Sequence, residues 1–125
     1  MQTVSELTSF RRAAMASGMS DEDIDDLIDF LAAYPDAGDE IEGTGGCRKL
    51  RFAIRGNNKG KSGGVRTITL FSGENMPVFL ITVFAKSVKI SLSKAERNAL
   101  KKLSREIIGA YSRRVLPIAA GGERA

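Results

Sequence analysis

The feature that most constrains the fold is a nearly unbroken apolar run, VFLITVFA, at residues 78–85. It is far shorter than the roughly 18 to 20 apolar residues that a membrane helix needs. Its β-branched and aromatic side chains favour a strand. A strand with no polar face has to be covered on both sides, which predicts the central strand of a sheet.

Two further strands are predicted before this run. CRKLRFAI at residues 47–54 and VRTITLFS at residues 65–72 both alternate between apolar and polar side chains. In the second strand, Arg66 is expected to share one face with Ile68 and Leu70. The sheet therefore carries a cation among apolar neighbours.

Helices are predicted on both sides of these strands in the chain. Residues 6–17 have helix-forming composition, and a second helix begins after Ser20, which forms a near capping box with Asp23. A long helix follows a second capping box, made by Ser93 and Glu96.

The predicted fold class is α+β. We expect a twisted antiparallel sheet of three to four strands, the first of them short and near residues 2–5, with helices packed on one face. The other face is then free for a ligand. Residues 1–112 are predicted to form a single domain and residues 113–125 a C-terminal tail.

Charge is divided unevenly along the chain. Residues 1–42 carry two basic and eleven acidic side chains, whereas residues 43–125 carry seventeen basic and four acidic ones. The stretch 43–66 alone contains seven cations, seven glycines and no acid. Such a surface suits a polyanion, and nucleic acid is the leading candidate.

The composition excludes most common catalysts. The chain has no histidine and a single cysteine, Cys47, so histidine-dependent nucleophiles, a zinc site and an internal disulfide are not expected. No cofactor is expected, and a reducing cytoplasm fits the cysteine content. Lysine and arginine remain, and these can cleave RNA, whose 2′-hydroxyl supplies the nucleophile. Lys59, Lys61 and Arg66 place both kinds of cation near one strand edge.

Several motifs resemble one known family. P-D-A-G-D at residues 35–39, G-T-G-G-x-R-K-L-R at 43–51 and G-K-S-G-G-x-R at 60–66, followed by FLITVFAKS and LSKAERNALKKL, are similar to RelE-type toxins of type II toxin–antitoxin modules. Within that family the HigB-like branch is the closest in pattern. The resemblance runs from about residue 20 to about residue 103.

The resemblance implies an mRNA interferase, that is, an endoribonuclease that cuts translated mRNA in the ribosome without a metal ion. It also implies a cognate helix-turn-helix antitoxin (HigA-like) and a cytoplasmic protein with no membrane association. Arg66 matches the arginine that stabilises the scissile phosphate, and Lys59, Lys61 and Lys86 match the other catalytic cations. The RNA backbone would be bound by Arg48, Lys49, Arg51, Arg55 and Lys89.

Two alternatives stay open. A noncatalytic RNA- or antitoxin-binding protein of the same fold is favoured by Val65, which stands where many members have an aromatic residue. It is also favoured by the lack of a tyrosine between residues 87 and 96, because the resemblance to RelE implies a tyrosine there that serves as the acid or stacks on a base. Lys59, Lys61 and Arg66 favour the enzyme. A DNA-binding autoregulator ranks last, since no basic helix-turn-helix is evident.

Overall fold

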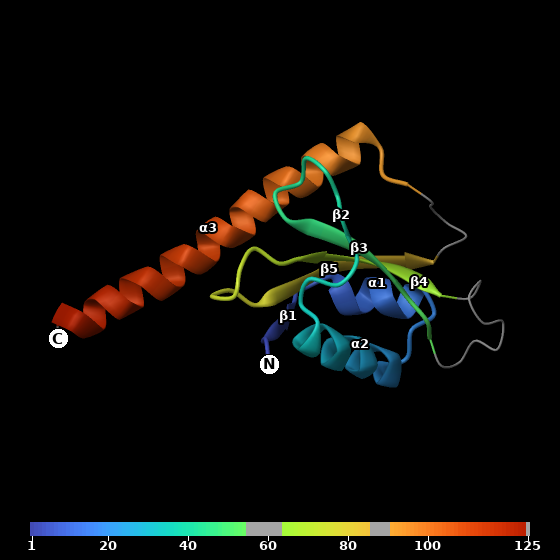
Figure 1. The fold of residues 1–125 in the computed structure, drawn as a ribbon, viewed down its shortest axis with the longest axis horizontal. Helices are drawn as coiled ribbons and strands as arrows, with labels where there is room; N and C mark the ends of the chain where they lie inside the picture. Colours follow the sequence, from blue (N-terminus) through green and yellow to red (C-terminus); the bar gives the residue numbers. More distant parts are fainter. Residues whose placement is uncertain (55–63, 86–90, 125) are drawn as a thin grey trace.

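The computed structural model describes residues 1–54, 64–85 and 91–124, with side chains as far as Arg113. Within these ranges, three helices and five strands form an α+β fold, which confirms the predicted class (Figure 1). In chain order they are β1 (Val4–Glu6), α1 (Phe10–Ala16), α2 (Asp21–Ala33), β2 (Asp39–Glu40), β3 (Cys47–Phe52), β4 (Val65–Leu70), β5 (Val78–Ala85) and α3 (Lys94–Arg124).

The strands form one sheet in the order β1-β5-β4-β3-β2. The apolar strand β5 lies inside the sheet between β1 and β4, as its sequence predicts. Two expectations need correction: the sheet has five strands rather than three to four, and it is mixed, because β1 pairs with β5 in parallel. The strand that was not foreseen, β2, consists of two exposed acidic residues, so it has no alternating pattern to reveal it.

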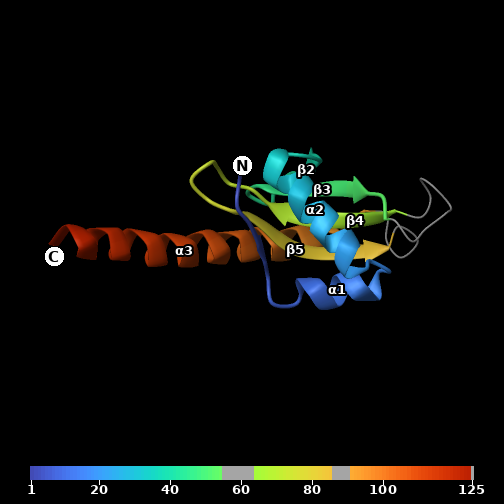
Figure 2. The same ribbon diagram turned by 90° about the horizontal axis from the view of Figure 1, so that it is seen from below.

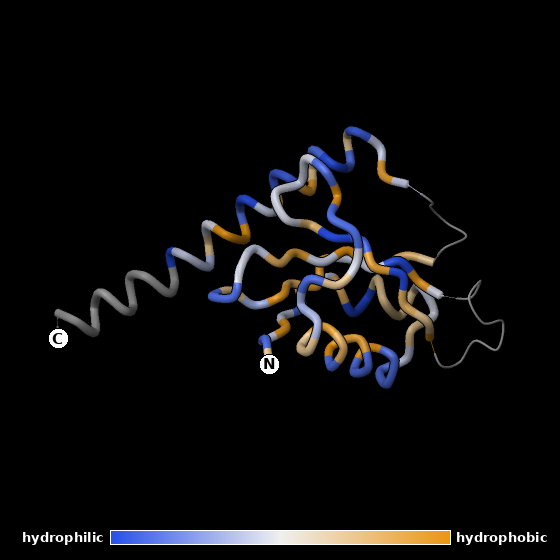
Figure 3. Tube along the Cα trace, in the orientation of Figure 1, coloured by the Kyte–Doolittle hydropathy of each residue, from blue (hydrophilic) through white to orange (hydrophobic). Residues whose placement is uncertain are grey.

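Helices pack on both faces of the sheet, not on one as expected. A first core joins α1 and α2 to one face through buried residues that include Phe10, Leu27 and Val65. A second core joins α3 to the other face, where Leu100, Leu103 and Ile107 pack against strand residues. Figure 3 shows the hydrophilic turns of α2 directed away from the sheet. The long apolar stripe of α3 has to be buried, and α1 and α2 already occupy the first face.

A β-bulge in β5 decides which side chains face α3. The register with β4 shifts between Ile68 and Thr69, and Ile81 is left without a partner. Leu80, which precedes the bulge, packs in the core with α1 and α2. After the bulge the side chains again alternate between the two faces, but displaced by one residue. Phe84 is thereby brought to the α3 face, where regular alternation would have excluded it.

Both predicted capping boxes are confirmed. Ser20 Oγ accepts from the Asp23 N–H at 3.1 Å, and the Asp23 carboxylate accepts from the Ser20 N–H at 2.9 Å. Ser93 and Glu96 exchange the same bonds at 3.1 and 2.8 Å at the start of α3. The backbone of α3 continues beyond the sheet as far as Arg124 (Figure 2). The division into a domain and a tail at residue 113 stays a prediction.

Candidate functional site

Arg66 is the centre of a cationic site on the α3 face of the sheet. It lies in β4, and in the register of the sheet it faces Arg51 of β3 on one side and Phe84 of β5 on the other. Directly opposed residues have Cβ atoms about 4.5–5.5 Å apart. Arg66 shares its face with Ile68 and Leu70, as the sequence predicts.

The guanidinium of Arg66 is largely buried, and it makes no ion pair with an acid among the described residues. The residue is 9% exposed, and its Nη1 is buried with no hydrogen-bond partner among the described residues. Burial lowers the pKa of Arg66, and the positive charge of Arg51 lowers it further. The ion pairs found among the described residues join Arg11 to Glu6 and to Asp21 instead. A planar donor fork held in this way is suited to bind a phosphate.

Only some of the predicted RNA-binding residues of β3 lie near Arg66. Lys49 and Arg51 alternate onto the same face as Arg66. Arg48 lies on the other face, where its Nη1 donates a hydrogen bond to the Gly38 carbonyl at 3.1 Å. The structure therefore separates Arg48 from the cluster that Lys49, Arg51 and Arg66 form.

The other predicted site residues lie outside the described residues. Arg55, Lys59 and Lys61 belong to residues 55–63, and Lys86 and Lys89 to residues 86–90. Their catalytic and RNA-binding roles stay predictions.

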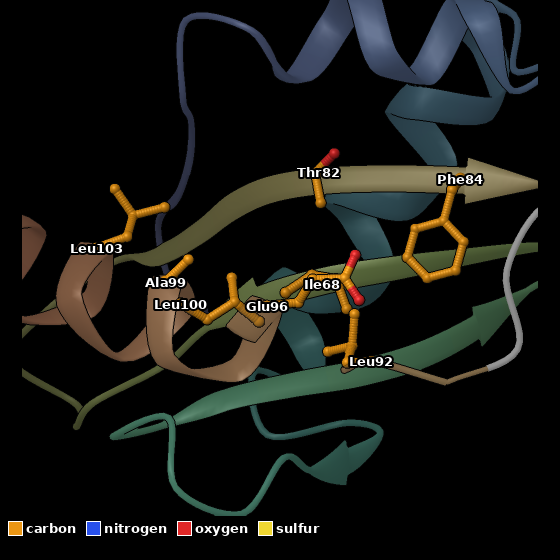
Figure 4. Close-up of a pocket in the computed structure, with 8 residues that line it drawn as sticks. All are labelled: Ile68, Thr82, Phe84, Leu92, Glu96, Ala99, Leu100 and Leu103. Carbon is orange, nitrogen blue, oxygen red and sulfur yellow. The ribbon is translucent and has the colours of Figure 1, made fainter. Parts of the chain in front are cut away.

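A pocket of about 360 Å³ lies on the same face as Arg66, between the sheet and the first turns of α3 (Figure 4). Its walls are largely apolar and are formed by Ile68, Thr82, Phe84, Leu92, Glu96, Ala99, Leu100 and Leu103. Sequence reasoning missed this pocket. It depends on the bulge at Ile81, for which the near-continuous apolar run of β5 gives no signal.

Cys47 is a buried core residue and not a nucleophile. Its Sγ lies 3.1 Å from the Ser104 Oγ, and burial raises the pKa of the Cys47 thiol. A raised thiol pKa keeps the reactive thiolate scarce at neutral pH.

Within the described ranges, no three Cys, Asp or Glu side chains are placed to hold a metal ion.

The chain also matches a known protein family. Residues 3–123 match a family model described as the RelE toxin of the RelE / RelB toxin-antitoxin system. The match covers nearly the whole chain. Among the described residues, no helix is long and apolar enough to cross a membrane.

Proposed function

The chain belongs to the RelE toxin family, and from this premise we propose that it is a ribosome-dependent mRNA endonuclease of the HigB-like branch. Toxins of this family generally inhibit translation by cleaving mRNA and have an antitoxin partner. We propose that the partner here is a HigA-like helix-turn-helix protein and that the toxin acts in the cytoplasm.

The observation that carries the proposal is the buried guanidinium of Arg66, whose Nη1 has no hydrogen-bond partner among the described residues, beside Arg51. Two neighbouring cations without an acid between them lower stability unless an anion is bound. A phosphodiester supplies that anion, and its charge grows as the reaction reaches the crowded phosphorane. Fixed donors that meet this growing charge lower the barrier to cleavage.

The reaction we propose needs no metal ion. The 2′-hydroxyl of the RNA attacks the adjacent phosphorus, a lysine takes the 2′ proton, and the bond to the 5′ oxygen breaks. A second lysine protonates that leaving oxygen, which gives a 2′,3′-cyclic phosphate and a 5′-hydroxyl. Lys59, Lys61 and Lys86 are the proposed proton carriers, because a lysine among other cations has a lowered pKa.

The flanking RNA backbone would be bound on both sides of this centre. Lys49 and Arg51 share the face of Arg66 and are suited to adjacent phosphates. Arg55 and Lys89 are proposed to extend the contact. We do not include Arg48, since it lies on the opposite face.

A noncatalytic protein of the same fold remains the second candidate, favoured by the lack of a tyrosine between residues 87 and 96. Val65, which stands where many members have an aromatic residue, also favoured this candidate, but its position in the fold weakens that argument. Val65 is 1% exposed and packs into the α1/α2 core. An aromatic residue there would point away from Arg66, so its absence removes nothing from the site.

The two candidates predict different RNA ends in cells. We would express the parent, Arg66→Ala and the control Arg12→Ala inducibly, and then map the 5′ ends of cellular mRNA. Arg12 is an exposed arginine of α1. Codon-phased cuts are expected for the parent and for Arg12→Ala and are expected to disappear in Arg66→Ala. Growth arrest by the parent without new cuts would support the noncatalytic candidate.

A further inference from the structure

We propose that the pocket under the first turns of α3 binds a base of the RNA whose phosphate Arg66 holds. The inference rests on the proposed function in one respect, namely that the ligand of Arg66 is RNA. It adds a specificity site formed by residues of β4, β5 and α3.

Arg66 is not itself a wall of the pocket, but two of the walls are its neighbours in the sheet. Phe84, which faces Arg66 across the β4–β5 pair, is also a wall of the pocket. Ile68, two residues after Arg66 on the same face, is a second wall. A phosphate on Arg66 and a group in the pocket are therefore neighbours, as are the phosphate and base of one nucleotide.

The walls fit a base better than a second phosphate. Ile68, Leu92, Leu100 and Leu103 are aliphatic, and the ring of Phe84 faces the same space (Figure 4). The volume lies within the range of about 300–1,000 Å³ that is usual for small-molecule sites. Aromatic and aliphatic walls suit the flat apolar faces of a base.

Charge fixes which end of the nucleotide enters. Glu96 is the charged residue of the pocket lining, and Figure 4 shows its side chain extending from α3 toward the middle of the pocket. Its Oε1 accepts from the Ser93 N–H at 2.8 Å, which holds the side chain in place. A carboxylate repels phosphate and accepts hydrogen bonds from base amino groups. The phosphate therefore belongs at Arg66 and the base beside Glu96.

A protein segment is a weaker candidate for this pocket. The large apolar side chains that are most exposed in the described part of the chain are Met1, Met15, Phe30 and Tyr34. Met15 lies on α1 and Phe30 on α2, and both helices pack on the face opposite the pocket. Apolar contacts to a partner protein are thus available elsewhere, while two walls of the pocket, Ile68 and Phe84, neighbour Arg66 in the sheet.

Nucleotide binding to the purified full-length chain tests the inference. The probes are the four nucleoside 5′-monophosphates and ribose 5-phosphate, titrated calorimetrically. AMP, CMP and GMP, which carry amino groups, are expected to bind about tenfold or more tightly than ribose 5-phosphate. Ala99→Leu, which fills the pocket from α3, should abolish this difference and leave the ribose 5-phosphate affinity unchanged. Ala110→Leu, the same change at an exposed position of α3 outside the pocket lining, should preserve it.

The outcomes separate this inference from the proposed function. Equal affinities for ribose 5-phosphate and the nucleotides in the parent, or no effect of Ala99→Leu, would overturn the base pocket and leave the nuclease standing. If Ala99→Leu weakens antitoxin binding and keeps the nucleotide preference, the pocket belongs to the antitoxin and the inference is wrong. If the preference is found and mRNA is uncut in cells, the pocket stands and the nuclease proposal fails.

Discussion

The buried Nη1 of Arg66, which has no hydrogen-bond partner among the described residues, has an energetic cost in the free protein that a bound anion would relieve. We expect Arg66→Leu to raise the free energy of unfolding by about 1 kcal/mol, because it removes a buried charge and an unsatisfied donor from an apolar strand face. Urea unfolding measures the change, and the same variant should abolish mRNA cleavage.

The matched control is Arg48→Leu on the opposite face of the sheet. Arg48 donates a hydrogen bond to the Gly38 carbonyl, so this variant should lose about 1 kcal/mol of stability. A loss of stability in Arg66→Leu as large as that of the control would show that Arg66 is satisfied in the free protein.

The buried thiol of Cys47 makes stability depend on pH in the alkaline range. Burial raises the pKa of Cys47 above its ordinary value of 9.0, so above that pH the unfolded chain has lost a proton that the folded chain still binds. This contribution is complete below 9.0 and is lost as the pH rises through the folded value. Unfolding at about pH 8 and about pH 10 should show a smaller alkaline loss of stability for Cys47→Ala than for the parent. Identical pH dependence in both would show that the thiol ionises as readily folded as unfolded.

At the level of secondary structure elements, the two short N-terminal helices differ in how they begin. Ser20 accepts a hydrogen bond at the start of α2, whereas Ser9, at the same position of α1, makes no side-chain cap. Ser20→Ala should therefore cost about 1 kcal/mol, and Ser9→Ala only a few tenths. Thermal or urea unfolding of the pair measures the difference. Equal losses would mean that the hydrogen bond seen at Ser20 adds nothing to stability.

The elements with strong local signals were predictable from the sequence. The run of β5, the alternation around Arg66 and the capping box at Ser20 all act within a few residues, so they are visible without the fold. The strand β2 and the bulge at Ile81 depend on pairing with a distant strand. The local sequence therefore predicts the cation at the centre of the site, but not the pocket beside it or the face that α3 covers.

For the whole molecule, the division of charge follows the two faces of the sheet in part. Most acids of residues 1–42 lie on α2, which packs on one face, while Lys49, Arg51 and Arg66 lie on the other. The separation is incomplete, because α1 carries two arginines and no acid, and Asp39 of β2 pairs with Lys49. An acidic surface repels a nucleic acid, and a cationic one attracts it. The α3 face should therefore be turned toward RNA when the protein binds.

Cations on the two faces should then differ in how they affect the salt dependence of binding. We expect Arg51→Gln to weaken binding to a ribosome carrying an mRNA analogue without the reactive 2′-hydroxyl. It should also reduce the slope of log affinity against log salt by about one, because one phosphate contact is lost. Arg48→Gln removes the same charge three residues earlier in the same strand but from the other face, so the slope should stay as in the parent. If both variants change the slope equally, net charge governs binding and the two faces of the sheet are not distinguished by RNA.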